Sequence, residues 1–109
     1  MSVQSDALGA RLRPLFVSRP LVEKKMFGGI GFMLNGNMAI GTTAKGDLLV
    51  RIDPARQDEA LARPGAYQMH MGTRPMTGFI AVASDHLDDA ALADWLAYSL
   101  SYAETLPPK

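Results

Sequence analysis

Four basic side chains are the residues of this sequence best suited to hold an anion: Lys24, Lys25, Arg51 and Arg74. Arginine presents parallel N–H donors that match a carboxylate or a phosphate at two points, whereas lysine supplies a single compact charge. Arg51 stands two residues before Asp53, so an ion pair within the chain is the competing interpretation. The sequence therefore offers four candidate interaction or anion-binding residues and leaves a structural role open.

The histidines and acids suggest no further chemistry. Ser84, Asp85 and His86 are the residue types of a hydrolytic triad, but neighbours on an extended chain point in alternate directions. His70 and His86 are the only histidines and there is no cysteine, so a zinc site would have to recruit carboxylates. We expect no catalytic residue, no metal and no cofactor.

A glycine-rich stretch, MFGGIGFML at residues 26–34, invites comparison with phosphate-binding loops. A dinucleotide fingerprint counted from Gly29 would need glycine where Leu34 stands. A phosphate loop is also followed by a helix, whereas the alternation here predicts a strand. We interpret Gly28 and Gly29 as positions that allow close backbone packing.

Length and composition predict one domain, residues 1–109, with 48% hydrophobic residues available for a core. Eleven basic residues balance eleven acidic ones, but residues 1–51 carry +4 and residues 84–109 carry −4. That polarity either orients a partner or simply reflects solvated faces. The lack of cysteine, of a signal peptide and of an apolar run of about 20 residues leads us to expect a cytoplasmic protein that does not enter the membrane.

The hydrophobic periodicity predicts an α+β domain of two layers, with a five-stranded antiparallel sheet and the order αβββαββα. A first helix should be interrupted near Pro14. Asn35 and Gly36 predict a type I′ turn in a hairpin. Asp53 and Asp88 are suited to cap two later helices. The expected ranges are strands at 26–34, 37–43, 48–52, 67–71 and 79–83, a loop at 72–78, and helices at 54–62 and from 88 onward.

Methionine is concentrated in the predicted strands. Six of the seven methionines fall between residues 26 and 76: Met26, Met33, Met38, Met69, Met71 and Met76. Methionine fills irregular gaps in cores and also supplies adaptable binding surfaces. A methionine-rich sheet face without helices over it would be a partner surface.

Four segments carry a family resemblance: EKKMFGGIGFMLNGNMAIG at 23–41, DLLVRIDP at 47–54, GTRPMTGF at 72–79 and DDAALADWL at 88–96. Over roughly residues 20–109 the chain resembles the N-terminal domain of the TfoX/Sxy family, bacterial regulators associated with natural competence. The resemblance implies an α+β domain with antiparallel strands and supplies no active residues. It marks as architectural motif positions Met26, Phe27, Gly28, Gly29, Asn35, Gly36, Gly78 and Phe79.

These observations favour a non-enzymatic regulatory or protein-interaction domain with a protein partner. A homodimer also fits, since a short antiparallel sheet leaves an edge or a face to be covered. The alternative is nucleic-acid binding, alone or as a transcription co-regulator, through the basic residues Arg11, Arg13, Arg19, Lys24, Lys25 and Arg51. A third reading is a small-anion-binding protein or unrecognised enzyme around Arg51, Arg74 and the glycine strand.

Overall fold

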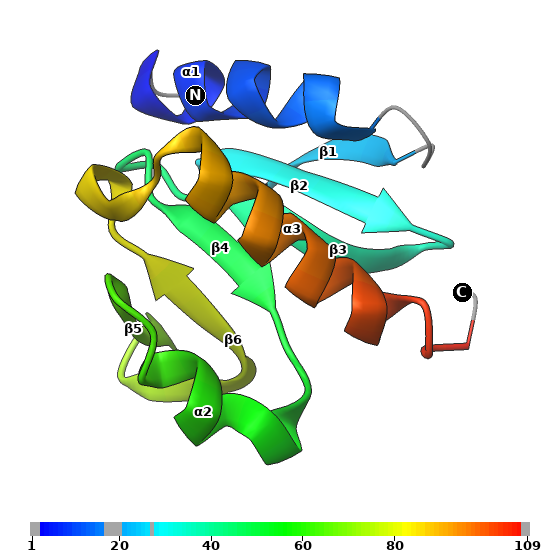
Figure 1. Cartoon of the computed structure of the whole chain (residues 1–109), viewed down its shortest axis with the longest axis vertical. Coiled ribbons are helices and arrows are strands. Elements are labelled where there is room, and N and C mark those ends of the chain that lie inside the picture. The colour runs from blue at the N-terminus through cyan, green and yellow to red at the C-terminus, as the bar shows by residue number, and fades with distance from the viewer. Residues whose placement is uncertain (1–2, 17–20, 27, 108–109) are drawn as a thin grey trace.

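Six antiparallel strands form one sheet in the order β1-β2-β3-β4-β6-β5 (Figure 1). The computed structural model describes residues 3–16, 21–26 and 28–107. The strands are β1 (Val22–Met26), β2 (Gly29–Leu34), β3 (Asn37–Thr42), β4 (Leu48–Arg51), β5 (Ala66–Met71) and β6 (Arg74–Val82). The helices are α1 (Val3–Leu12), α2 (Gln57–Leu61) and α3 (Asp89–Ala103), so the order is αββββαββα. The α+β class and the antiparallel sheet are confirmed.

The prediction of five strands was wrong by one strand at the N-terminal edge. Val22–Met26 forms β1, which pairs with β2 and brings Met26 opposite Gly29. The predicted strand 26–34 therefore begins at Gly29, and Gly28 lies in the connection with a φ of +76°. Phe27 and the predicted turn at Arg19–Pro20 lie outside the described residues. The sequence did not predict this strand because Glu23, Lys24 and Lys25 interrupt the alternation of apolar residues by which a strand is recognised. Charged residues are nevertheless common on edge strands.

The predicted loop at residues 72–78 is also wrong in part, because β6 already begins at Arg74. Pro75 is tolerated there because β4 pairs only with residues 79–82 of β6, so the first half of β6 has a strand on one side alone. The predicted helix at 54–62 is divided into a 3₁₀ turn, Pro54–Arg56, and the short α2. Such short 3₁₀ pieces are common at helix starts.

Local signals of turns and caps are confirmed. Asn35 and Gly36 have φ angles of +53° and +83°, as a type I′ turn requires. Asp53 accepts a hydrogen bond from the amide of Ala55 at 2.9 Å, and Asp88 from that of Ala91 at 2.7 Å. As expected, α1 is interrupted near Pro14 and gives way to a 3₁₀ turn, Arg13–Phe16.

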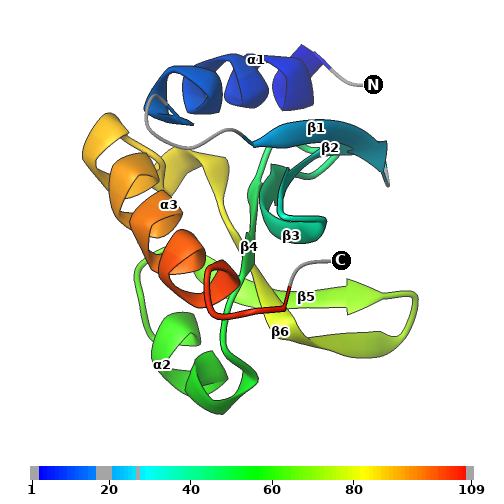
Figure 2. The same ribbon diagram turned by 90° about the vertical axis from the view of Figure 1, so that its right-hand side faces the viewer.

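The three helices of the described residues lie on one side of the sheet, and the core fills the space between (Figure 2). Leu12, Phe32, Val50, Ile80 and Leu92 are fully buried there and come from α1, β2, β4, β6 and α3. None of the described helices combines the length and the apolar character needed to cross a membrane. The opposite side of the sheet carries no helix among the described residues.

Candidate interaction face

One row of residues crosses the whole sheet on the side away from the helices. Paired residues of neighbouring antiparallel strands lie on the same face. Leu48, Val50 and Ile52 pack into the core, so Leu49 and Arg51 point to the opposite, helix-free face. Following the register from Leu49 in both directions gives the row Lys24, Gly31, Gly41, Leu49, Ala81 and Tyr67.

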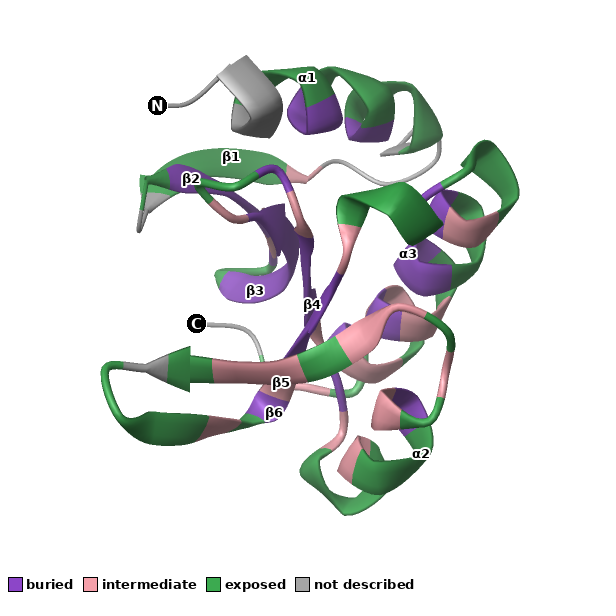
Figure 3. Cartoon of the chain, turned by 90° about the vertical axis from the view of Figure 1, so that its left-hand side faces the viewer, coloured by how far each residue is buried: buried purple, intermediate pink, exposed green. Residues whose placement is uncertain are grey.

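The middle of this row is buried although no helix covers it. Leu49 is 5% exposed and Ala81 is not exposed at all. Gly31 and Gly41 stand opposite each other, and the methyl carbon of Met38 lies only 2.8 Å from where a Cβ of Gly41 would be. The side chain of Met38 therefore occupies the space that the glycine leaves. The sheet is strongly curved (Figures 2 and 3).

Arg51 lies at the end of β4 on the helix-free face, which we define by Met33, Met38, Leu49, Arg51, Phe79 and Tyr67. Its guanidinium carbon lies 5.5 Å from the ring centroid of Phe79, its partner across β4 and β6. Among the described residues no acid forms an ion pair with Arg51, and Asp53 is engaged in capping. A guanidinium stacked on a ring keeps its N–H edge for another acceptor.

Tyr67 closes one end of the row by a bond to the turn between β3 and β4. Its hydroxyl donates to one carboxylate oxygen of Asp47, and the other accepts from the amide of Ser84 at 3.0 Å. Burial and the bond to Asp47 raise the pKa of Tyr67 above its ordinary value. Beside this contact lies a shallow hollow of about 370 Å³, lined by Thr43, Ala44, Lys45, Tyr67, Gln68, Met69 and His70.

The four candidate cations of the sequence do not form one group. Lys24 and Lys25 are both exposed on β1 but point to opposite faces, since Lys24 pairs with Gly31 and Lys25 with Ile30. Arg74 is exposed at the tip of the β5–β6 hairpin, five residues from Phe79. Among the described residues, Arg51 is the one of the four that lies over an aromatic ring.

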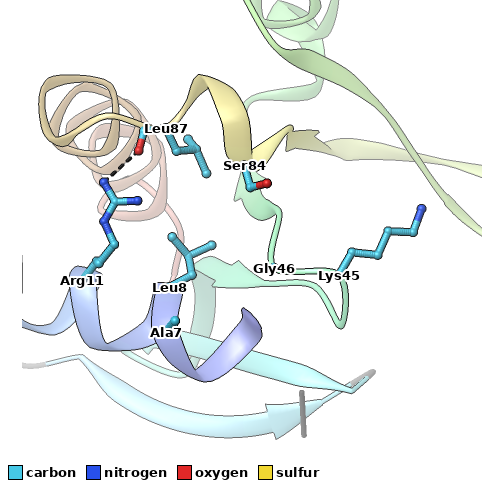
Figure 4. A pocket seen from close by; sticks show the side chains of 7 residues that line it. All are labelled: Ala7, Leu8, Arg11, Lys45, Gly46, Ser84 and Leu87. Carbon is cyan, nitrogen blue, oxygen red and sulfur yellow. Dashed lines mark hydrogen bonds between the residues drawn. The ribbon is translucent and has the colours of Figure 1, made fainter. Parts of the chain in front are cut away.

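Arg11 of α1 and Arg13 of the 3₁₀ turn that follows it are both engaged on the helix side. Arg11 donates to the carbonyl of Leu87 at 2.7 Å and pairs with Asp89 at 3.2 Å. In Figure 4, Arg11 and Leu87 border a second hollow, of about 170 Å³, and the ammonium of Lys45 points away from Arg11. Arg13 holds Glu23 with two bonds of 2.7 and 2.9 Å, which lower the pKa of Glu23. Arg19 lies outside the described residues.

The methionines divide between the two halves of the sheet. Met33 is half-buried and Met38 buried on the helix-free face, opposite each other in β2 and β3. Met69 and Met76 are half-buried in β5 and β6. The side chains of Met26 and Met71 lie outside what the structure describes. The helix-free face thus contains both Met33 and Met38 and the Arg51–Phe79 pair.

The sequence pattern of the TfoX N-terminal domain matches residues 12–103, which is most of the chain. The chain belongs to the TfoX N-terminal domain family. Neither the curated proteins nor the solved structures contain a match to it. Within the described part of the chain, no cluster of three or more acidic or histidine side chains is placed to hold a metal ion.

The glycine motif of this TfoX N-terminal domain serves the packing of two strands. A Cβ on Gly29 would lie 1.9 Å from the carbonyl oxygen of Thr42, a contact that no residue but glycine permits. The hydroxyl of Thr42 accepts from the amide of Ile30 at 3.0 Å, so β2 and the end of β3 are locked together. At Gly29 the motif fixes a close strand approach.

The second motif, which contains Gly78 and Phe79, forms an irregularity in β6. Gln68 pairs with Ile80 but His70 with Pro75, so one residue of β5 faces four of β6. Gly78 has a φ of +88°, and its amide donates to the side chain of Gln57 at 2.7 Å. In this TfoX N-terminal domain the motif therefore produces the irregular part of β6, next to Phe79. Neither Gln57 nor Tyr67 was singled out from the sequence, because their contacts depend on strand register.

Proposed function

We propose that this TfoX N-terminal domain is a non-enzymatic regulatory module that binds a protein partner on the helix-free face. The observation that carries the proposal is Arg51, stacked on half-buried Phe79 at 5.5 Å on a side of the sheet that carries no helix among the described residues. Aromatic and arginine side chains are the residues that most often dominate binding energy at protein interfaces. The resemblance to bacterial regulators supports the regulatory part.

The chemistry of the face suggests what the partner presents. Met33 and Met38 provide an adaptable apolar surface, and Arg51 provides charged donors. The five carboxylates of residues 84–109 are exposed around α3, on the helix side, so acidic groups are concentrated away from this face. A partner segment that combines apolar side chains with a carboxylate complements the face in both shape and charge.

Capture from a lysate of the source organism, followed by binding measurements with the purified partner, tests the proposal. Arg51→Glu reverses the charge beside Phe79, and Lys25→Glu makes the same reversal on the helix side of β1. We expect Arg51→Glu to weaken binding at least tenfold, of the order seen for interface arginines, and Lys25→Glu to leave it within about twofold. Equal affinity of both variants for every captured protein would refute binding at this face.

Nucleic-acid binding is the competing function, and the pairing of Arg11 with Asp89 and of Arg13 with Glu23 weighs against it. Titration with duplex and single-stranded DNA at two salt concentrations separates the two. Binding that falls steeply with salt and disappears in Lys24→Gln/Lys25→Gln would move the function to nucleic acid. Under our proposal neither DNA form binds measurably at physiological salt.

A further inference from the structure

The two edges of the sheet differ sharply in charge. β1 and β5 are the edge strands, because they occupy the ends of the strand order. In β1, Glu23, Lys24 and Lys25 are all exposed, whereas β5, with the sequence AYQMHM, carries no formal charge. Charged side chains, lysine above all, keep an edge from pairing with another strand. The β5 edge lacks that protection.

The outer side of β5 is also open and its backbone is continuous. The irregular pairing with β6 places the additional residues in β6, so β5 itself runs on through Met69. The side chain of Gln68 fills the gap on the β6 side, where it donates to the carbonyls of Met69 and Met76 at 2.8 and 3.2 Å. No described element lies beyond β5 in the sheet (Figure 3). Gly72, at its end, has nothing within 4 Å of a Cβ position.

We propose that β5 pairs antiparallel with β5 of a second copy of this chain, which joins two sheets into one across a two-fold axis. Closed two-fold dimers are the commonest oligomers, and their interface is made of the same patch twice. Self-pairing of an uncharged strand brings no like charges together. The net charge of the whole chain is zero, so electrostatic repulsion between two copies is small. The same pairing at β1 would bring lysines from both copies together. This dimer is independent of partner binding and leaves both helix-free faces open.

Sedimentation equilibrium from about 1 µM to about 1 mM tests the dimer with the protein alone, since a single strand pair is a small and therefore weak interface. We expect the mass to rise from 11.8 kDa toward twice that value. His70→Lys places a charge on β5 and should shift the midpoint at least tenfold to higher concentration. Val22→Lys, at an exposed position of β1, should not shift it.

Three results would overturn the proposal. They are a wild-type mass that stays at 11.8 kDa throughout, equal dimerisation of the two variants, and loss of the dimer in Val22→Lys alone. A persistent monomer would leave the β5 edge to a strand of another protein. Circular dichroism establishes that both variants are folded, which their exposed positions lead us to expect.

Hydrogen exchange locates the interface without any substitution. Outward-facing amides of β5 become hydrogen-bonded in the dimer, so peptides covering residues 66–71 should gain protection as concentration rises. Peptides covering residues 22–26 should not change. Protection that appears at β1 and not at β5 would place the contact at the wrong edge and refute the proposal. Because partner binding is measured with Arg51→Glu, failure of one proposal is distinguishable from failure of the other.

Discussion

At Gly29, a methyl group in the Cβ position would overlap the carbonyl oxygen of Thr42 at 1.9 Å. The obstacle is backbone, which cannot rotate away as a flexible side chain can. We expect Gly29→Ala to lower the free energy of unfolding by about 3 kcal/mol or more, measured by urea titration. Gly72→Ala is the matched control, since only its φ of +64° opposes the change and the expected cost is about 1 kcal/mol. Equal losses would contradict the steric role of Gly29.

Tyr67 gives the protein a specific sensitivity to alkali. Its pKa is raised in the folded state by burial and by the bond to Asp47, so the folded state holds the phenolic proton more tightly than the unfolded one. The resulting stability is complete below pH about 10, the unfolded value, and is lost as the pH rises above it. Urea titrations at pH 8 and 10.5 should show a larger fall in stability for the wild type than for Tyr67→Phe.

The same variant has a second expected effect at neutral pH. Loss of the Asp47 contact should cost about 1 kcal/mol, a modest value because Tyr67 is 37% exposed. A stability difference between the two proteins that does not change with pH would show that the bond to Asp47 does not form.

Sequence reasoning at the scale of single residues identified Arg51 but not its surroundings. Residue type marked the arginine as a binding group, and the family motif marked Phe79 as architectural. That the two stack depends on which residue of β6 faces which residue of β4. The sequence left an ion pair between Arg51 and Asp53 open as the competing interpretation, but the carboxylate of Asp53 caps the turn that begins at Pro54.

At the scale of elements, α2 controls the shape of β6. The side chain of Gln57 accepts from the amide of Gly78 at 2.7 Å and donates to the side chain of Gln68 at 3.0 Å. We expect Gln57→Ala to cost about 2 kcal/mol, because it leaves half-buried polar groups without partners, and to speed hydrogen exchange at residues 76–78. Asp58→Ala, one residue further on the exposed side of α2, should cost about 0.5 kcal/mol. Unchanged exchange at residues 76–78 in Gln57→Ala would show that β6 holds its irregular shape without α2.

Most elements were predictable because their signals are local. The caps at Asp53 and Asp88 and the turn at Asn35-Gly36 depend on a few neighbouring residues and were confirmed. β1 and the first half of β6 were not predicted as strands. In both, tertiary pairing overrides the local pattern: charges on an edge in β1, and turn-forming residues within a long hairpin in β6.

At the scale of the whole molecule, one core connects all three helices with five of the strands. Trp95, the only tryptophan, is 3% exposed within it, with the guanidinium of Arg63 4.9 Å from its ring. We expect thermal unfolding followed by Trp95 fluorescence and by far-ultraviolet circular dichroism to coincide in one transition. Two separate transitions would contradict the prediction of a single domain.

The acidic part of the sequence lies on the helix side of the sheet. The acidic segment at residues 84–109 supplies α3, and the helix-free face carries Lys24 and Arg51. Composition alone predicted the polarity but not the direction, because direction depends on which side of the sheet α3 covers. The surroundings of Arg51 on the helix-free face were likewise beyond reach from sequence, since they require the register of five strands at once.

The row from Lys24 to Tyr67 contains two kinds of position, inner residues that set the curvature of the sheet and end residues that are available for binding. Its four inner members are small or buried, so a larger residue at any of them must flatten or distort the bend. Its two ends are exposed, so substitutions there leave the bend of the sheet intact, although a change at Tyr67 also removes its bond to Asp47. Substitutions at the two ends of the row are therefore expected to change what the domain binds. The glycines, leucine and alanine between them keep the curvature of the sheet constant.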